Sequence, residues 1–147
     1  MIRPATHLAF ALVTGVIALA ATAPAAEAQA IKIPAGVAGS WESKAMVGAK
    51  DSVITTLVTT STADTKGWTV QFPNRPLLQA RVLAAGGDSV VIEVGPYESI
   101  LRKGQQATTR TTSHYKGDVI TGSFEAKYSN GDIVKGKLAG KRAKAKS

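Results

Sequence analysis

The chain has 147 residues, with 18 Lys and Arg against 10 Asp and Glu for a formal net charge of +8, and it contains no cysteine. The lack of cysteine excludes disulfide bonds, thiol nucleophiles, thiolate metal sites and lipid attachment through a thioether or thioester. Residues 31–147 are enough for one compact domain and too few for two, so a single hydrophobic core has to stabilise the fold.

The first thirty residues have the layout of a secretory signal peptide. Arg3 and His7 form a short polar start, residues 8–20 are apolar, and small-residue cleavage sites follow. We expect cleavage after Ala28 or Ala30 and a secreted or periplasmic mature protein, and the alanine-rich segment is typical of a bacterial signal. An uncleaved N-terminal membrane anchor is the alternative, because the apolar run approaches the length that spans a bilayer.

After this segment, apolar and polar residues alternate with period two, and no helical run of useful length occurs. Clusters of Gly, Pro, Asn and Asp separate the alternating stretches. The pattern predicts strands at 40–47, 52–61, 67–72, 77–85, 89–94, 97–102, 105–115, 118–128 and 133–142. A bulge at Gly95-Pro96 would join two of these into one bent strand.

The even spacing without crossover helices favours an all-β, antiparallel up-and-down meander. We expect it to close into a small eight- or nine-stranded barrel over residues 31–142, followed by a basic tail at 143–147. A β-sandwich is the alternative, because two packed sheets show the same strand periodicity.

Three hairpins allow the strand register to be predicted, because a slip of one residue would place charged side chains in the core. A three-residue loop at 130–132, a three-residue loop at 86–88 and a two-residue turn at 116–117 keep the apolar faces together. The predicted pairs are Phe124 with Leu138, Arg81 with Glu93, Ala84 with Val90, and Thr111 with Gly122. The small inner residues Thr111 and Gly122 leave room either for a modest cavity or for close packing of tilted strands.

One short motif resembles a known family. Gly39-Ser40-Trp41 opens the first strand, and Arg142 ends the last strand. This is similar to the calycins, which comprise the lipocalins, fatty-acid-binding proteins and avidins, where a Gly-x-Trp on the first strand lies under a basic residue from the last. The resemblance implies an eight-stranded barrel that binds a small, usually apolar ligand in its mouth, with Gly39, Trp41 and Arg142 closing the opposite end.

Aromatic side chains are the candidate ligand contacts, since they bring the largest apolar area per residue. An ordinary core role is the alternative for all of them. The candidates are Trp41, Trp68, Phe72, Phe124 and Tyr128.

Catalytic chemistry has little support in the sequence. His114 is the only histidine after the N-terminal segment, and its register places it on an outer face. No second histidine or carboxylate cluster stands at metal-ligand spacing, and nothing resembles a phosphate loop or a nucleophile elbow. We therefore expect no enzymatic activity, no cofactor and no metal.

These observations predict a non-enzymatic binding protein for a small molecule or an envelope component. The alternative is a protein-interaction module, such as an inhibitor or envelope-assembly factor, that uses a strand edge or the basic C-terminus. Basic residues near the C-terminus are candidates for contact with an anionic envelope surface, or simply for solubility. They are Lys141, Arg142, Lys144 and Lys146. No combination of aromatic and basic residues points to nucleic acid.

Overall fold

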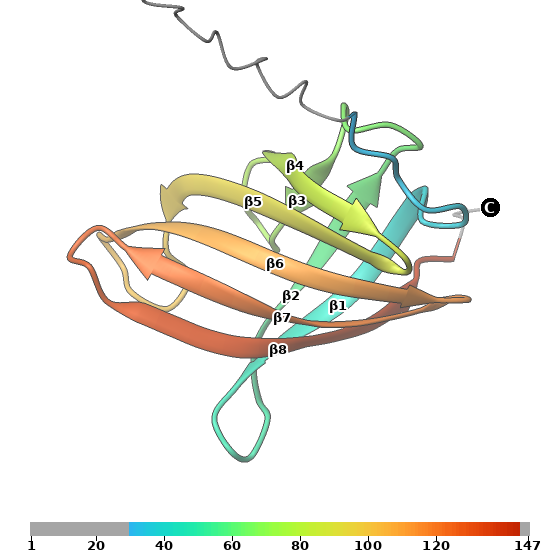
Figure 1. Ribbon diagram of the computed structural model, residues 1–147. Helices are drawn as coiled ribbons and strands as arrows, with labels where there is room; N and C mark the ends of the chain where they lie inside the picture. Colours follow the sequence, from blue (N-terminus) through green and yellow to red (C-terminus); the bar gives the residue numbers. More distant parts are fainter. Residues whose placement is uncertain (1–29, 145–147) are drawn as a thin grey trace, which may run out of the picture.

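The computed structural model describes residues 30–144, which form eight antiparallel strands closed into a barrel (Figure 1). The strands are β1 (Gly39–Val47), β2 (Ser52–Ser61), β3 (Thr69–Gln71), β4 (Leu78–Gly86), β5 (Ser89–Glu98), β6 (Gln106–Lys116), β7 (Val119–Tyr128) and β8 (Ile133–Arg142). Each strand pairs with its neighbours in sequence, and β8 pairs with β1. The predicted antiparallel barrel is therefore confirmed, and the sandwich alternative is wrong.

The predicted signal peptide and Lys146 lie outside the described residues. Within residues 30–144, no helix has the length and apolar character needed to cross a membrane.

Period-two alternation separates the barrel interior from its surface. In β7, Ile120 and Phe124 are buried, whereas Thr121 and Glu125 on the opposite face are exposed. Successive side chains of a strand point to opposite sides of the sheet, so this alternation places one face of every long strand in a shared core. The largest fully buried side chains in the described part of the chain are Trp41, Trp68, Ile120, Val37 and Val90.

The prediction of a separate strand at 97–102 is wrong. β5 continues through Gly95-Pro96 to Glu98, with a shift in its pairing to β6 between Val94 and Tyr97. The bulge that would join the two predicted strands is thus present, and residues 99–105 form a loop. The barrel consequently has eight strands rather than nine.

The β6–β7 hairpin differs from the predicted register by two residues. The turn is formed by Gly117-Asp118, one position later than predicted, and Thr111 therefore faces Phe124 instead of Gly122. A displacement of two residues keeps every side chain on its predicted face. His114 accordingly points outward, with about half of its side chain exposed (51%).

The β7–β8 hairpin is also displaced by two residues. The backbone N–H of Tyr128 donates to the carbonyl of Asp132 at 2.8 Å, which moves the three-residue loop one position toward β7. Phe124 therefore faces Gly136 rather than Leu138. A Cβ on Gly136 would overlap the ring of Phe124, so this glycine makes room for the aromatic side chain.

The β4–β5 hairpin confirms one predicted pair and corrects the other. Arg81 faces Glu93 and forms an ion pair with it. Beyond Val82 a register shift in β4 places Val90 opposite Ala85 instead of Ala84. The shift accommodates a two-residue turn where three residues were predicted.

The two ends of the barrel are formed by different segments. The base end comprises the N-terminal segment 30–38, the connections 62–68, 87–88 and 117–118, and the end of β8. The mouth end comprises the connections 48–51, 72–77, 99–105 and 129–132. In Figure 1 the β1–β2 hairpin extends beyond the other strands, and the N-terminal segment from residue 30 lies near the end of β8.

Candidate functional site

The mouth half of the barrel contains an apolar cavity of about 70 Å³. Its walls include Phe72, Val94, Ala107, Phe124, Ala126 and Tyr128. An engineered apolar cavity of about 150 Å³ holds a benzene molecule, and pockets for drug-sized ligands reach about 300–1,000 Å³. The cavity is therefore suited to a narrow apolar group rather than to a large ligand.

The β5–β6 loop belongs both to the cavity wall and to the surface of the barrel. Leu101 lines the cavity and is also 45% exposed. Ile100 beside it lines the cavity and is partly buried. The loop thus forms part of the wall and part of the rim, at the end where the calycin resemblance places the mouth.

Four of the hydroxyl groups in the cavity wall pair with one another. The hydroxyls of Tyr97 and Thr109 lie 2.7 Å apart, and the Ser99 hydroxyl donates to the Tyr128 hydroxyl at 3.2 Å. Burial raises the pKa of Tyr97, so its hydroxyl stays protonated at neutral pH. These pairs reduce the polarity that the wall would present to an apolar ligand.

The buried Ser99 fixes the start of the β5–β6 loop. Its hydroxyl oxygen accepts hydrogen bonds from the backbone N–H groups of Leu101 (3.2 Å) and Arg102 (3.1 Å). Arg75, from the β3–β4 connection, donates to the carbonyl oxygens of Glu98 and Ser99. Two connections at the mouth are therefore held together across the rim.

An arginine lies over an aromatic ring at the mouth. The guanidinium carbon of Arg102 is 4.4 Å from the centre of the Tyr128 ring. The same guanidinium donates to the carboxylate of Asp132 at 2.7 Å. This ion pair, together with a hydrogen bond from the Asn130 amide, lowers the pKa of Asp132.

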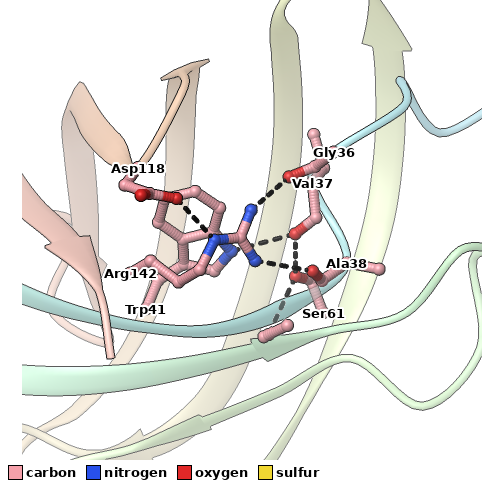
Figure 2. A network of polar contacts seen from close by, with 8 residues as sticks. Gly36, Val37, Ala38, Trp41, Ser61, Asp118 and Arg142 are labelled. Carbon is pink, nitrogen blue, oxygen red and sulfur yellow. Dashed lines mark hydrogen bonds and ion pairs between the residues drawn. The ribbon is translucent and has the colours of Figure 1, made fainter. Parts of the chain in front are cut away.

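A second arginine lies over an aromatic ring at the base. Trp41 and Arg142 are partners in the β1–β8 ladder, and the guanidinium carbon is 4.3 Å from the ring centre. The guanidinium donates to the carbonyl of Ala38 at 2.8 Å, to that of Gly36 at 2.6 Å and to the carboxylate of Asp118 at 3.0 Å (Figure 2). Arg142 thereby holds the N-terminal segment against the end of the barrel.

Further contacts close the base. The Val37 carbonyl accepts hydrogen bonds from the Trp41 indole N–H at 2.9 Å and from the Ser61 hydroxyl at 2.5 Å. Val37 is 1% exposed, and Tyr115 packs edge-on against Trp41 at 4.9 Å. These buried side chains and the segment above them fill the base of the barrel.

A steric constraint explains why the first residue of the Gly-x-Trp motif is glycine. Gly39 adopts a φ of +139°, and a Cβ at this position would lie 2.5 Å from Nη1 of Arg142. Any larger residue would strain the backbone and displace the guanidinium.

The five aromatic candidates divide into two groups. Phe72, Phe124 and Tyr128 line the cavity. Trp41 and Trp68 are fully buried and are not part of the cavity wall, and the Trp68 indole donates to the carbonyl of Asp64 at 2.8 Å. The structure therefore brings three of the candidates together and places both tryptophans in the core.

Sequence reasoning missed the loop residues of the mouth. Ser99, Leu101 and Arg102 were assigned to a strand, although they carry the rim contacts and part of the cavity wall. Lys103-Gly104 marked the end of the loop but not its beginning. The signal that could have located the start is Ser99 itself, because serine often bonds to backbone N–H groups two and three residues ahead.

The surroundings of His114 do not form a catalytic relay. Its Nδ1 lies 2.7 Å from the Ser89 hydroxyl and 3.4 Å from the Asp88 carboxylate. Both contacts involve the same ring nitrogen, whereas a nucleophile–base–carboxylate relay uses both nitrogens. Within residues 30–144, no group of three or more histidine and acidic residues is arranged to hold a metal ion.

The fold and the contacts at its base define a closed, eight-stranded antiparallel barrel that is compatible with the calycin arrangement. Comparison of the chain with protein-family models, with curated proteins and with solved structures finds no match.

Proposed function

We propose that this protein is a non-enzymatic binding protein, secreted or periplasmic, that takes a small apolar molecule or the apolar end of a larger one into its barrel. The observation that carries the proposal is the contrast between the ends. The base is filled by Trp41 and covered by Arg142, whereas the mouth leads into an apolar cavity. The calycin resemblance supports the same type of function.

The dimensions of the cavity indicate the kind of ligand. Its volume of about 70 Å³ matches a short alkyl segment or a few atoms of a ring better than a whole cofactor. The hydroxyl groups of Ser99 and Tyr128 lie toward the mouth and pair with each other, whereas those of Thr59 and Ser113 lie deeper in the wall. The ligand therefore inserts an apolar end, and any polar group it carries remains at the mouth.

Native mass spectrometry tests this proposal. Mature protein is purified from the envelope fraction of its own host, and its mass is compared before and after denaturation. A discrete non-covalent adduct is the expected result and gives the mass of the ligand. A bare chain that also fails to bind added 1-hexanol would contradict the proposal.

Two neighbouring positions of β6 provide a matched pair of variants. Ala107 lines the cavity, and Thr108 points to the opposite face of the same strand. Ala107→Leu adds three atoms inside the cavity and is expected to weaken 1-hexanol binding by about tenfold or more. Thr108→Leu adds apolar bulk outside and is expected to leave the affinity unchanged.

A specific observation favours protein interaction as a second candidate. β3 pairs with β2 only at Val58–Thr60, so the edge of residues 52–57 has no ladder partner on that side. A groove of about 710 Å³ lies alongside, with Thr56 and Gln71 in its wall. No residue of β2 is charged, so nothing in the strand opposes pairing with an added strand. A native mass of two chains that Thr56→Lys abolishes would favour this function.

A further inference from the structure

Exposed apolar side chains are distributed unevenly between the two ends of the barrel. Each of the four connections at the mouth carries one in it or within two residues of it: Val53, Leu77, Leu101 and Ile133, with exposed fractions of 54%, 55%, 45% and 51%. The other two exposed large apolar residues in the described part of the chain are Val119 at the base, at 51%, and Val58 within β2, at 37%.

This arrangement surrounds the opening of the cavity. The four connections join the strands in order around the barrel, so their apolar side chains are spread around its rim. Leu101 belongs both to this set and to the cavity wall. A ring of exposed apolar side chains around an apolar opening, unlike side chains scattered singly over a surface, favours contact with another apolar phase.

The charged groups of the same connections favour an anionic surface. Two acidic residues of the connections are neutralised: Asp51 pairs with Lys137 at 3.0 Å, and Asp132 pairs with Arg102 at 2.7 Å. Glu98, next to the β5–β6 loop, is exposed and forms no ion pair with the described residues, but the basic residues of the connections outnumber it. Lys50 in the β1–β2 connection and Lys103 in the β5–β6 loop form no ion pair with the described residues.

We propose that the mouth of the barrel docks on an anionic lipid surface, with the four apolar side chains entering the boundary between headgroups and acyl chains. Lys50 and Lys103 attract the headgroups, and the rim side chains supply apolar contact. The opening of the cavity then faces the bilayer. The idea that the barrel takes its ligand from this bilayer rests on the function proposed above. The docking itself does not depend on that function.

Co-sedimentation with vesicles tests the docking. The mature protein is mixed with vesicles of equal parts phosphatidylglycerol and phosphatidylcholine, and in parallel with vesicles of phosphatidylcholine alone. We expect binding to the anionic vesicles that is about tenfold stronger than binding to the neutral ones and that weakens with added salt. Failure to bind the anionic vesicles at low salt would overturn the proposal.

A matched set of variants locates the contact. Leu77 and Ile133 belong to the rim but not to the cavity wall, and Val119 has the same exposed fraction as Ile133 at the opposite end. The double variant Leu77→Ser, Ile133→Ser is expected to weaken vesicle binding by about tenfold or more, and Val119→Ser by less than about twofold. Equal effects of both, or no effect of the double variant, would contradict docking through the mouth.

Two controls separate this proposal from the proposed function. Thermal unfolding and binding of 1-hexanol in solution show whether the double variant remains folded with an intact cavity. A protein that binds 1-hexanol but no vesicles refutes the docking alone. A protein that binds vesicles through its rim but takes up neither 1-hexanol nor any native ligand refutes the proposed function alone.

Discussion

Both ends of the barrel hold an arginine over an aromatic ring, yet only one end is closed. The distances are nearly equal: 4.3 Å from Arg142 to Trp41 at the base and 4.4 Å from Arg102 to Tyr128 at the mouth. The base arginine uses its remaining donors to hold backbone carbonyls of the N-terminal segment. Each arginine also pairs with an exposed carboxylate of its own end, Asp118 at the base and Asp132 at the mouth, but Arg102 donates to no backbone carbonyl.

The comparison shows that the contact between arginine and ring does not by itself seal a barrel. What closes the base is the segment that the guanidinium holds, since Val37 of this segment is buried beneath it. At the mouth Arg102 holds no such segment over the Tyr128 ring, and the cavity remains beside this ring. The two ends should therefore respond differently to equivalent substitutions.

The largest expected effect is that of removing the ring at the base. Trp41 is fully buried, and truncation of such a side chain leaves a cavity and removes most of its packing. Trp41→Ala is expected to lower the free energy of unfolding by about 3–5 kcal/mol. Leu101→Ala at the mouth, where the side chain is 45% exposed, is expected to lower the free energy of unfolding by much less. Urea denaturation of both variants measures the difference, and equal losses would contradict the assignment of Trp41 to a sealed core.

The two arginines provide the next comparison. Arg142→Ala removes the donors to two backbone carbonyls and uncovers the Trp41 ring. We expect a loss of about 2–4 kcal/mol, because hydrogen bonds to charged groups contribute more than neutral ones. Arg102→Ala should have a smaller effect, since Arg102 holds one exposed carboxylate and no backbone carbonyl of another segment. Chemical denaturation of both variants measures the two losses in unfolding free energy. A larger loss in Arg102→Ala than in Arg142→Ala would refute this account.

Tyr115 at the base gives a prediction for alkaline pH. Burial raises the pKa of this tyrosine to about 12, from a usual value near 10.0. The unfolded chain therefore loses the proton first, so the stabilisation is fully present below about pH 10 and declines as the pH rises toward 12. The decline amounts to about 2–3 kcal/mol.

The variant Tyr115→Phe isolates this contribution. The difference in unfolding free energy between wild type and variant should shrink between about pH 10 and 12, while titration of the lysines affects both proteins alike. A difference independent of pH over this range would show that Tyr115 ionises freely in the folded protein.

The smallest expected effect concerns Asp132 at the mouth. The Arg102 guanidinium, followed by the Asn130 amide, lowers the pKa of its carboxyl below 3.8. The resulting stabilisation is present above the unfolded pKa and is lost as the pH falls through the lower folded value. In Arg102→Ala, NMR titration should show the pKa of Asp132 moving back toward 3.8. The pKa of Asp64, lowered chiefly by the Lys66 backbone N–H and the Thr62 hydroxyl, should not move and serves as the control.

The sequence predicted the barrel well because alternation is a local property. Inward and outward faces were correct throughout β6, β7 and β8, since a register error of two residues leaves the faces unchanged. The two-residue displacement of the register depends on how side chains from different strands fit together. Gly136 has to face Phe124 because the ring occupies the space of a Cβ, and alternation alone does not reveal which aromatic residue a glycine accommodates.

The candidate site was harder to predict because its parts come from distant segments. The motif residues Gly39, Trp41 and Arg142 meet as the resemblance implied, since pairing of the first and last strands brings them together. The cavity lies instead where side chains from several strands leave a space, and no single stretch of sequence encodes a space. Trp68 and Phe72 lie on the same strand face, so the sequence pattern placed both among the candidate ligand contacts. Only Phe72 lines the cavity, because the two residues lie at different depths in the barrel.

NMR of selectively labelled methyl groups during titration with 1-hexanol tests the central claim most directly. If the mouth is open to apolar ligands and the base is sealed, the methyl signals of Ala107, Ala126 and Ile100 shift saturably, while those of Ile33 and Val37 do not move. The absence of saturable shifts at the mouth, or shifts confined to the methyl groups of the base, would contradict this account.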